Sequence, residues 1–192
     1  MRSAWAGSTP ALTGGGSMGG PGPGLVACVG CRGEVPDVDG PTHDYLIASP
    51  GCWQIYGQWA ARRAWSEPVD PIVAAHHVDC YAVQHPGGVE RDRRQRQSVA
   101  VHLISLCRLL EFGEPPQDGA RKRTRTGRVV LAALDLDAWP LLDPPERRGG
   151  TTIADVAVAT DDDLPSVFRR WLHDCWDAWS EHHTTVREWA GR

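Results

Sequence analysis

Three cysteines and a histidine lie close together near the start of the chain, and their spacing limits how this part can fold. Cys28 and Cys31 form a Cys-x2-Cys pair, His43 follows after eleven residues, and Cys52 follows after eight more. Glycines inside and after the pair let the backbone turn sharply, so that both thiolates can point at one ion. The pattern favours one Zn2+ ion bound by Cys28, Cys31, His43 and Cys52, which would hold a loop-rich segment in place.

Two other interpretations of these residues stay open. A Cys-x2-Cys pair can be a redox-active dithiol, but that chemistry needs the pair at the start of a helix that follows a strand, within a strand–helix pattern. No such pattern surrounds Cys28 and Cys31. Cysteine is also among the residue types most often simply buried. Cys52 and His43 are weaker candidates for a ligand than the pair.

The composition predicts one folded domain after a short tail. Residues 1–24 are rich in Gly and Pro and cannot bury apolar surface, so we expect them to be disordered. Residues 25–192 are expected to form a single domain that includes the metal-binding segment 25–53, and 41% hydrophobic content is enough for a core. The chain shows no apolar run typical of a signal peptide or a membrane span. Six irregularly spaced cysteines without an export signal favour a reduced, cytoplasmic protein.

Apolar residues at three- and four-residue steps predict helices along most of the remaining chain. The fold class is therefore mainly α, a helical domain with a loop-rich, metal-stapled N-terminal segment. Residues 129–136 are ambiguous between a short strand and a helical turn. The expected helices are 51–65, 71–84, 97–112, a short one after Thr152 that ends near Ala159, one from Leu164 to about Trp179, and a last turn or two that carries His182, Val186 and Trp189.

The basic residues argue against a nucleic-acid partner. The densest run, residues 121–128, holds four arginines and the only lysine of the chain. No aromatic residue interleaves this run and the whole chain has a formal charge of −4, so a solvated loop is the favoured interpretation.

A second group of candidates consists of histidines on or beside the predicted helices. We single out His85, His102 and His182 as candidate catalytic residues, because a helical bundle can bring such segments together around a metal or an acid–base site. His182 shares a predicted face with two apolar residues and is expected to point inward, and Asp79 could orient one of the histidines. Weaker candidates are His76, His77 and His183. Histidines beside an apolar face are more often ordinary core or boundary residues, and that interpretation stays open.

Several short motifs together resemble a bacterial family known only as a domain of unknown function. They are Cys28-x2-Cys31, Gly40-Pro41-Thr42-His43-x-Tyr45, Ser49-Pro50-Gly51-Cys52-Trp53, Asp79-x-Tyr81-x2-Gln84-His85-Pro86-Gly87, residues 98–103 (SVAVHL) and His182-His183-x2-Val186-Arg187-x-Trp189. The resemblance extends from about Leu25 to Trp189 and implies a shared cytosolic fold and the same site, but no activity. Cys80 departs from the family pattern, where a small residue is expected.

Two functions of different classes follow from these patterns. The favoured one is a metal-binding protein with a closed, structural zinc knuckle, whose helical domain binds a small molecule or a protein partner. The alternative is a zinc-dependent hydrolase or lyase that uses a histidine-containing site. Neither function requires a membrane.

Overall fold

The computed structural model describes residues 24–64, 70–87, 93–116, 127, 129–133, 135 and 139–191. The described chain is mainly helical with one small sheet of two strands, which confirms the predicted fold class. The predicted disordered tail, except Gly24, and the basic run, except Gly127, lie outside the described residues.

A small hairpin begins the described chain. Strands β1 (Leu25–Ala27) and β2 (Glu34–Pro36) pair antiparallel, with Val26 opposite Val35. The turn between them is closed by two backbone hydrogen bonds, from Cys28 N to the Gly33 carbonyl at 2.8 Å and from Arg32 N to the Cys28 carbonyl at 3.0 Å. Arg32 adopts the left-handed conformation, with φ of 66°. The turn thereby brings both cysteines of the Cys-x2-Cys pair to one end of the hairpin.

Three helices follow the loop-rich segment: α1 (Pro50–Ala64), α2 (Pro71–Gln84) and α3 (Arg93–Leu110). The start of α2 is set by Asp70, whose side chain accepts a hydrogen bond from Ile72 N at 2.7 Å, and by Pro71 in the first turn. Its end at Gln84 is where the sequence predicted it, because the residue before Pro86 is pushed out of the helical region.

The C-terminal part is also helical. Its elements are α5 (Ile153–Val158), α6 (Leu164–Ala178), the short 3-10 helix η2 (Ser180–His182) and α7 (His183–Ala190). Helix α5 opens with the predicted capping box, in which Thr152 and Asp155 exchange side-chain and backbone hydrogen bonds. Residues 129–133, which were ambiguous in the sequence, are helical.

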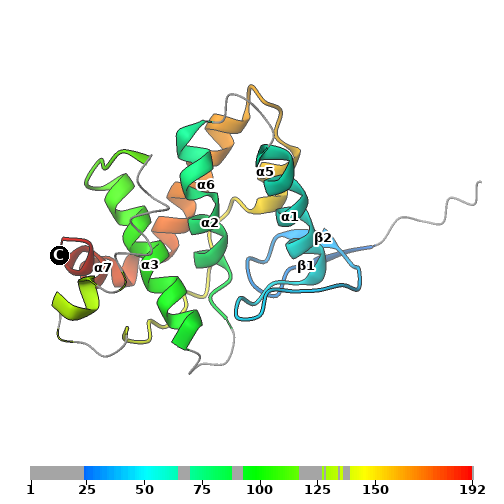
Figure 1. Cartoon of the computed structure of the whole chain (residues 1–192). Helices are drawn as coiled ribbons and strands as arrows, with labels where there is room; N and C mark the ends of the chain where they lie inside the picture. The colour runs from blue at the N-terminus through cyan, green and yellow to red at the C-terminus, as the bar shows by residue number, and fades with distance from the viewer. Residues whose placement is uncertain are drawn as a thin grey trace, which may run out of the picture.

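The helices pack in two groups (Figure 1). The first holds α2, α3, α6 and α7, and the second holds α1 and α5. The groups meet where α5 packs on α6 and where Tyr56 of α1 contacts the rings of His77 and Tyr81 in α2. Helix α2 packs against α3 and α6, and α3 also contacts α7, whereas α1 packs against α5 and β2. Buried tryptophans fill the first group: the indole of Trp171 donates to the side-chain oxygen of Gln84 at 2.7 Å, and that of Trp179 to the Val83 carbonyl at 3.1 Å. These two hydrogen bonds fix the C-terminal end of α2 against α6.

None of the helices in the part of the chain that the structure describes is both long and apolar enough to cross a membrane.

Candidate metal centre

Four buried side chains converge where the hairpin, α1 and the end of α2 meet. They are Cys28, Cys31, Cys52 and His85, whose ligand atoms all lie within 4.8 Å of one another. The Cys31 and Cys52 sulfurs are 3.9 Å apart, and His85 Nε2 lies 3.3 Å from Cys52 Sγ and 3.7 Å from Cys28 Sγ. A tetrahedral ion with usual zinc–sulfur and zinc–nitrogen bonds places its ligand atoms roughly 3.5–3.8 Å apart. The group therefore has the size and shape of a four-coordinate metal site.

The backbone around the group leaves no spare room. Cys28 and Cys31 come from the hairpin turn, Cys52 from the first turn of α1, and His85 from the residue after α2. A Cβ atom at Gly30 would lie 2.1 Å from the Ile47 carbonyl oxygen and 2.4 Å from the His85 ring. Position 30 therefore requires glycine, because the His85 imidazole lies directly over the turn and leaves no room for a Cβ atom.

Hydrogen bonds around the group orient its members. His85 Nδ1 donates to the Tyr81 carbonyl at 2.6 Å, so Nε2 keeps its lone pair and faces the three sulfurs. The Tyr81 ring stacks on the His85 ring with centroids 4.0 Å apart, and its hydroxyl donates to Cys52 Sγ at 3.7 Å. Ser49 N donates to Cys28 Sγ at 3.5 Å. Donors aimed at sulfur stabilise thiolates, which are the form of cysteine that binds metals.

The three thiols titrate together. Hydrogen bonds from Cys31 and Cys52 hold the pKa of Cys28 far below that of an ordinary thiol. The hydrogen bond to Cys28 raises the pKa of Cys31 to about 12, and hydrogen bonds to Cys28 and Cys31 raise that of Cys52 well above the usual range. One negative charge is thus shared by three sulfurs. A bound divalent cation would stabilise all three as thiolates.

His43, expected as the fourth ligand, lies outside this group. Its Nδ1 accepts a hydrogen bond from Tyr45 N at 3.4 Å, and its ring packs edge-on against Tyr45 and Trp53. The fourth member is His85, which the sequence assigned to a separate histidine site. Local spacing favoured His43, whereas His85 arrives from 33 residues beyond Cys52 because α2 runs back toward the hairpin. The one signal in the sequence was its constrained position before Pro86.

The structure does not bring His85, His102 and His182 together. His102 Nδ1 binds Asp79, so the expectation that Asp79 orients a histidine matches the geometry. His182 does not point inward: it is half-buried, and its Nε2 lies 2.9 Å from the Asp143 carbonyl oxygen. The reason is the 3-10 helix η2, which ends at His182 and interrupts the spacing that would have placed it with Val186 and Trp189.

The three weaker candidates also have local partners. His76 binds Asp79, His77 Nδ1 pairs with the Tyr56 hydroxyl at 3.1 Å, and His183 stacks on Trp176 with ring centroids 3.8 Å apart.

The fold and the site together define a class of protein. It is mainly helical and has a buried group of three cysteines and one histidine that can hold a metal ion. The chain belongs to a family of unknown function (DUF5946), whose model matches residues 26–180. The resemblance drawn from the motifs is thus confirmed. No curated protein and no solved structure was found to match the chain.

Proposed function

We propose that Cys28, Cys31, Cys52 and His85 bind one zinc ion, and that this ion serves as a structural clamp in a metal-binding protein of the reducing cytoplasm. The observation that carries the proposal is the burial of all four side chains, none of which is more than 2% exposed. Three sulfur ligands and one imidazole nitrogen are a donor set typical of structural zinc. Thiolate ligands also select against magnesium and calcium, which prefer oxygen.

A closed site favours a structural role over catalysis at the metal. Catalytic zinc keeps one position for water or substrate, whereas four protein ligands saturate a tetrahedral ion. The Tyr81 ring stacks on His85, and Ile47 N donates a hydrogen bond to the His85 carbonyl at 3.3 Å, so neighbouring residues pack closely around the group. The hydrolase or lyase alternative is therefore not supported at this metal site.

The clamp would join parts of the chain that are far apart in sequence. Cys28, Cys31 and Cys52 belong to the hairpin and α1, whereas His85 directly follows α2, which packs against α3 and α6. Binding one ion would hold the N-terminal segment on the helical domain, as metal binding does in small domains whose loops lack a core of their own. The helical domain would then act as a binding or accessory module for a small molecule or a protein.

The test is elemental analysis of the purified full chain and of three variants. We expect about one zinc per chain in the parent and in His43→Ala, and loss of zinc in His85→Ala. His85→Cys should retain zinc, because a fourth thiolate also completes a tetrahedral site. This last variant separates loss of a ligand from a general failure to fold.

Two results would refute the proposal. One is a parent that, after exposure to zinc and dialysis, contains no metal. The other is a set of variants in which His43→Ala loses the ion while His85→Ala keeps it, which would restore the ligand set expected from spacing alone.

A further inference from the structure

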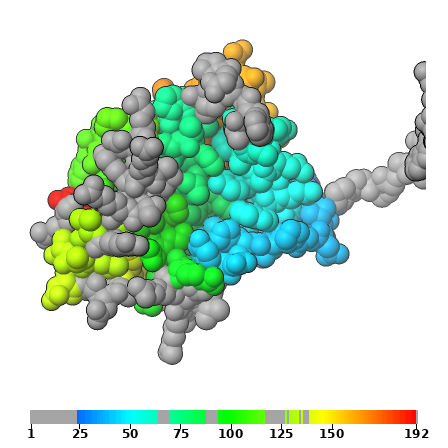
Figure 2. Space-filling view, viewed as in Figure 1, coloured from blue at the N-terminus to red at the C-terminus, as the bar shows by residue number. Residues whose placement is uncertain are grey.

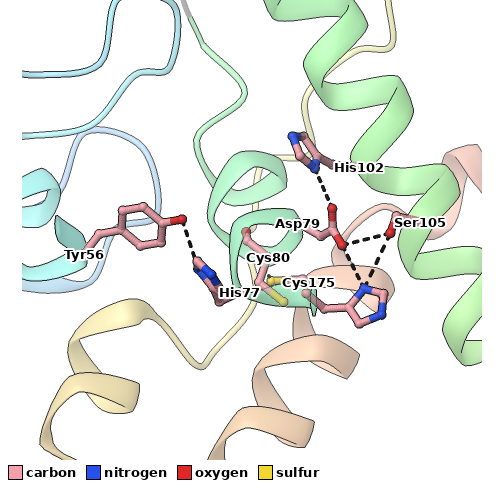
Figure 3. Close-up of polar contacts among 8 residues, drawn as sticks. Tyr56, His77, Asp79, Cys80, His102, Ser105 and Cys175 are labelled. Carbon is pink, nitrogen blue, oxygen red and sulfur yellow. Dashed lines mark hydrogen bonds and ion pairs between the residues drawn. The ribbon is translucent and has the colours of Figure 1, made fainter. Parts of the chain in front are cut away.

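A second cluster of polar side chains surrounds Asp79, on the opposite flank of α2 from Tyr81. Asp79 is completely buried, and its carboxylate accepts three hydrogen bonds (Figure 3). His102 Nδ1 binds Oδ1 at 2.5 Å, and His76 Nδ1 and the Ser105 hydroxyl bind Oδ2 at 2.8 and 2.9 Å. A carboxylate without solvent needs such donors, so the cluster holds Asp79 rigidly between α2 and α3.

The two histidines of this cluster differ in what their second ring nitrogen can reach. His76 Nε2 is buried and has no hydrogen-bond partner within the described chain. The His102 side chain is 13% exposed, and Figure 3 shows its second ring nitrogen on the side turned away from Asp79. Because Nδ1 donates to the carboxylate, Nε2 of a neutral His102 carries the lone pair. His102 is therefore the member of the cluster that can meet a ligand.

A cleft of about 300 Å³ lies where His102 is exposed. One wall is a single face of α3, formed by Arg94, Gln97, Ser98, Val101 and His102, which recur at three- and four-residue steps. The other wall is Tyr45 from the N-terminal segment, whose ring lies 5.3 Å from the Arg94 guanidinium carbon. Figure 2 shows this segment, in light blue, against the green atoms of α3.

The lining defines the chemistry of a ligand. Arg94 is the charged side chain among the described residues that line the cleft. A guanidinium at the rim favours a carboxylate or a phosphate group. Ser98 and Gln97 add neutral hydrogen-bonding groups between Arg94 and His102, and the volume suits a small molecule.

We propose that this cleft binds a small anionic molecule, one with a carboxylate or a phosphate group, and that His102 Nε2 takes up and returns a proton of that molecule. The proton leaves an O–H or an acidic C–H bond whose electron pair stays on the ligand, and it forms the second N–H bond of His102. The resulting imidazolium faces the Asp79 carboxylate, which makes Asp79 a positioning residue. Return of the proton restores the starting state. The metal centre takes no part in this step.

The binding test uses the full chain with 15N-labelled histidine, titrated separately with inorganic phosphate and with acetate. We expect at least one anion to shift the His102 ring signals saturably while the exposed His173 on α6 stays unchanged. Arg94→Gln should weaken binding about tenfold, as expected for loss of one charged hydrogen bond. Arg169→Gln, the same change at an exposed site on α6, should have no effect. The anion that binds tells a phosphate ligand from a carboxylate ligand.

The proposal fails if neither anion moves His102 selectively, or if the two arginine variants weaken binding equally. A second readout addresses the proton. The nitrogen shifts of the parent should show neutral His102 with its hydrogen on Nδ1, and Asp79→Asn should abolish that preference. A parent in which the hydrogen sits on Nε2 would overturn the proposed role even if Asp79→Asn does not fold.

Discussion

Gly30 lies between the two cysteines of the hairpin turn, where there is no room for a Cβ atom. Gly30→Ala would place Cβ against the Ile47 carbonyl oxygen and the His85 ring, so the turn or the imidazole must move. We expect destabilisation by about 1–3 kcal/mol, the usual cost of overpacking, together with weaker zinc binding. Urea unfolding of the zinc-loaded protein measures the first effect and competition with a chelator the second.

The control for Gly30 is Gly57, an exposed glycine within α1. A Cβ atom there has no neighbour within 4 Å, so Gly57→Ala should stabilise the protein by about 0.5–1 kcal/mol through helix propensity. Equal effects of the two substitutions would show that the close approach at Gly30 does not constrain the folded protein.

The ligands of the metal centre could be predicted from the sequence only where they lie close to one another along the chain. Cys28, Cys31 and Cys52 were recognised as ligand candidates because short spacing and turn residues bring them near one another, and all three belong to the buried group. The choice between His43 and His85 depends on where α2 ends in space. That depends on tertiary packing, which spacing along the chain does not contain.

Among the helices, α5 depends most clearly on a local capping interaction at its start. Thr152 Oγ1 accepts from Ala154 N at 3.3 Å, and Asp155 accepts from Thr152 N at 2.7 Å. Thr152→Ala should cost about 1 kcal/mol, as loss of an N-cap does, and it should loosen α5 against α1. Thr184→Ala, at an exposed position in α7, is the matched control and should be close to neutral. Thermal unfolding of both variants provides the measurement, and a Thr152 variant as stable as the control would contradict the role of the cap.

Helices with strong end signals were predictable, and elements without them were not. Asp70, Pro71 and Pro86 mark both ends of α2, which runs over the predicted residues. Helix α3 begins at Arg93, earlier than predicted, because its first turn is polar and lacks the apolar spacing of the rest. The β1–β2 hairpin was missed, since three-residue strands are too short to show alternation.

For the molecule as a whole, the shared charge of the three thiols predicts how zinc binding depends on pH. Near neutral pH the lowered pKa of Cys28 leaves it ionised, whereas the raised pKa values of Cys31 and Cys52 keep both protonated. Binding requires three thiolates, so about two protons should leave and the affinity should rise about 100-fold per pH unit. It should fall correspondingly as the pH falls, because protons compete with the metal.

Calorimetry in buffers of different ionisation enthalpy counts the released protons. Release of about three would mean that the sulfurs titrate as independent thiols, and release of none would mean that they are not the ligands.

The clamp also predicts which part of the molecule changes when the metal is removed. The hairpin turn around Arg32 is held by two backbone hydrogen bonds and by its cysteines, whereas α2, α3, α6 and α7 pack on one another without it. Chelation should therefore expose the Arg32–Gly33 bond to trypsin while most of the helical circular dichroism persists, because local opening follows the weakest cooperative unit. Cleavage after Arg108 is the internal control and should stay slow. Arg108 lies in α3, and its guanidinium donates two hydrogen bonds to the Ala190 carbonyl. Mass spectrometry of the early fragments reports both sites.

If Arg32 is cut equally fast with and without the metal, the turn does not depend on the ion. If Arg108 is cut as fast as Arg32 after chelation, the metal supports the whole fold and not only its N-terminal segment.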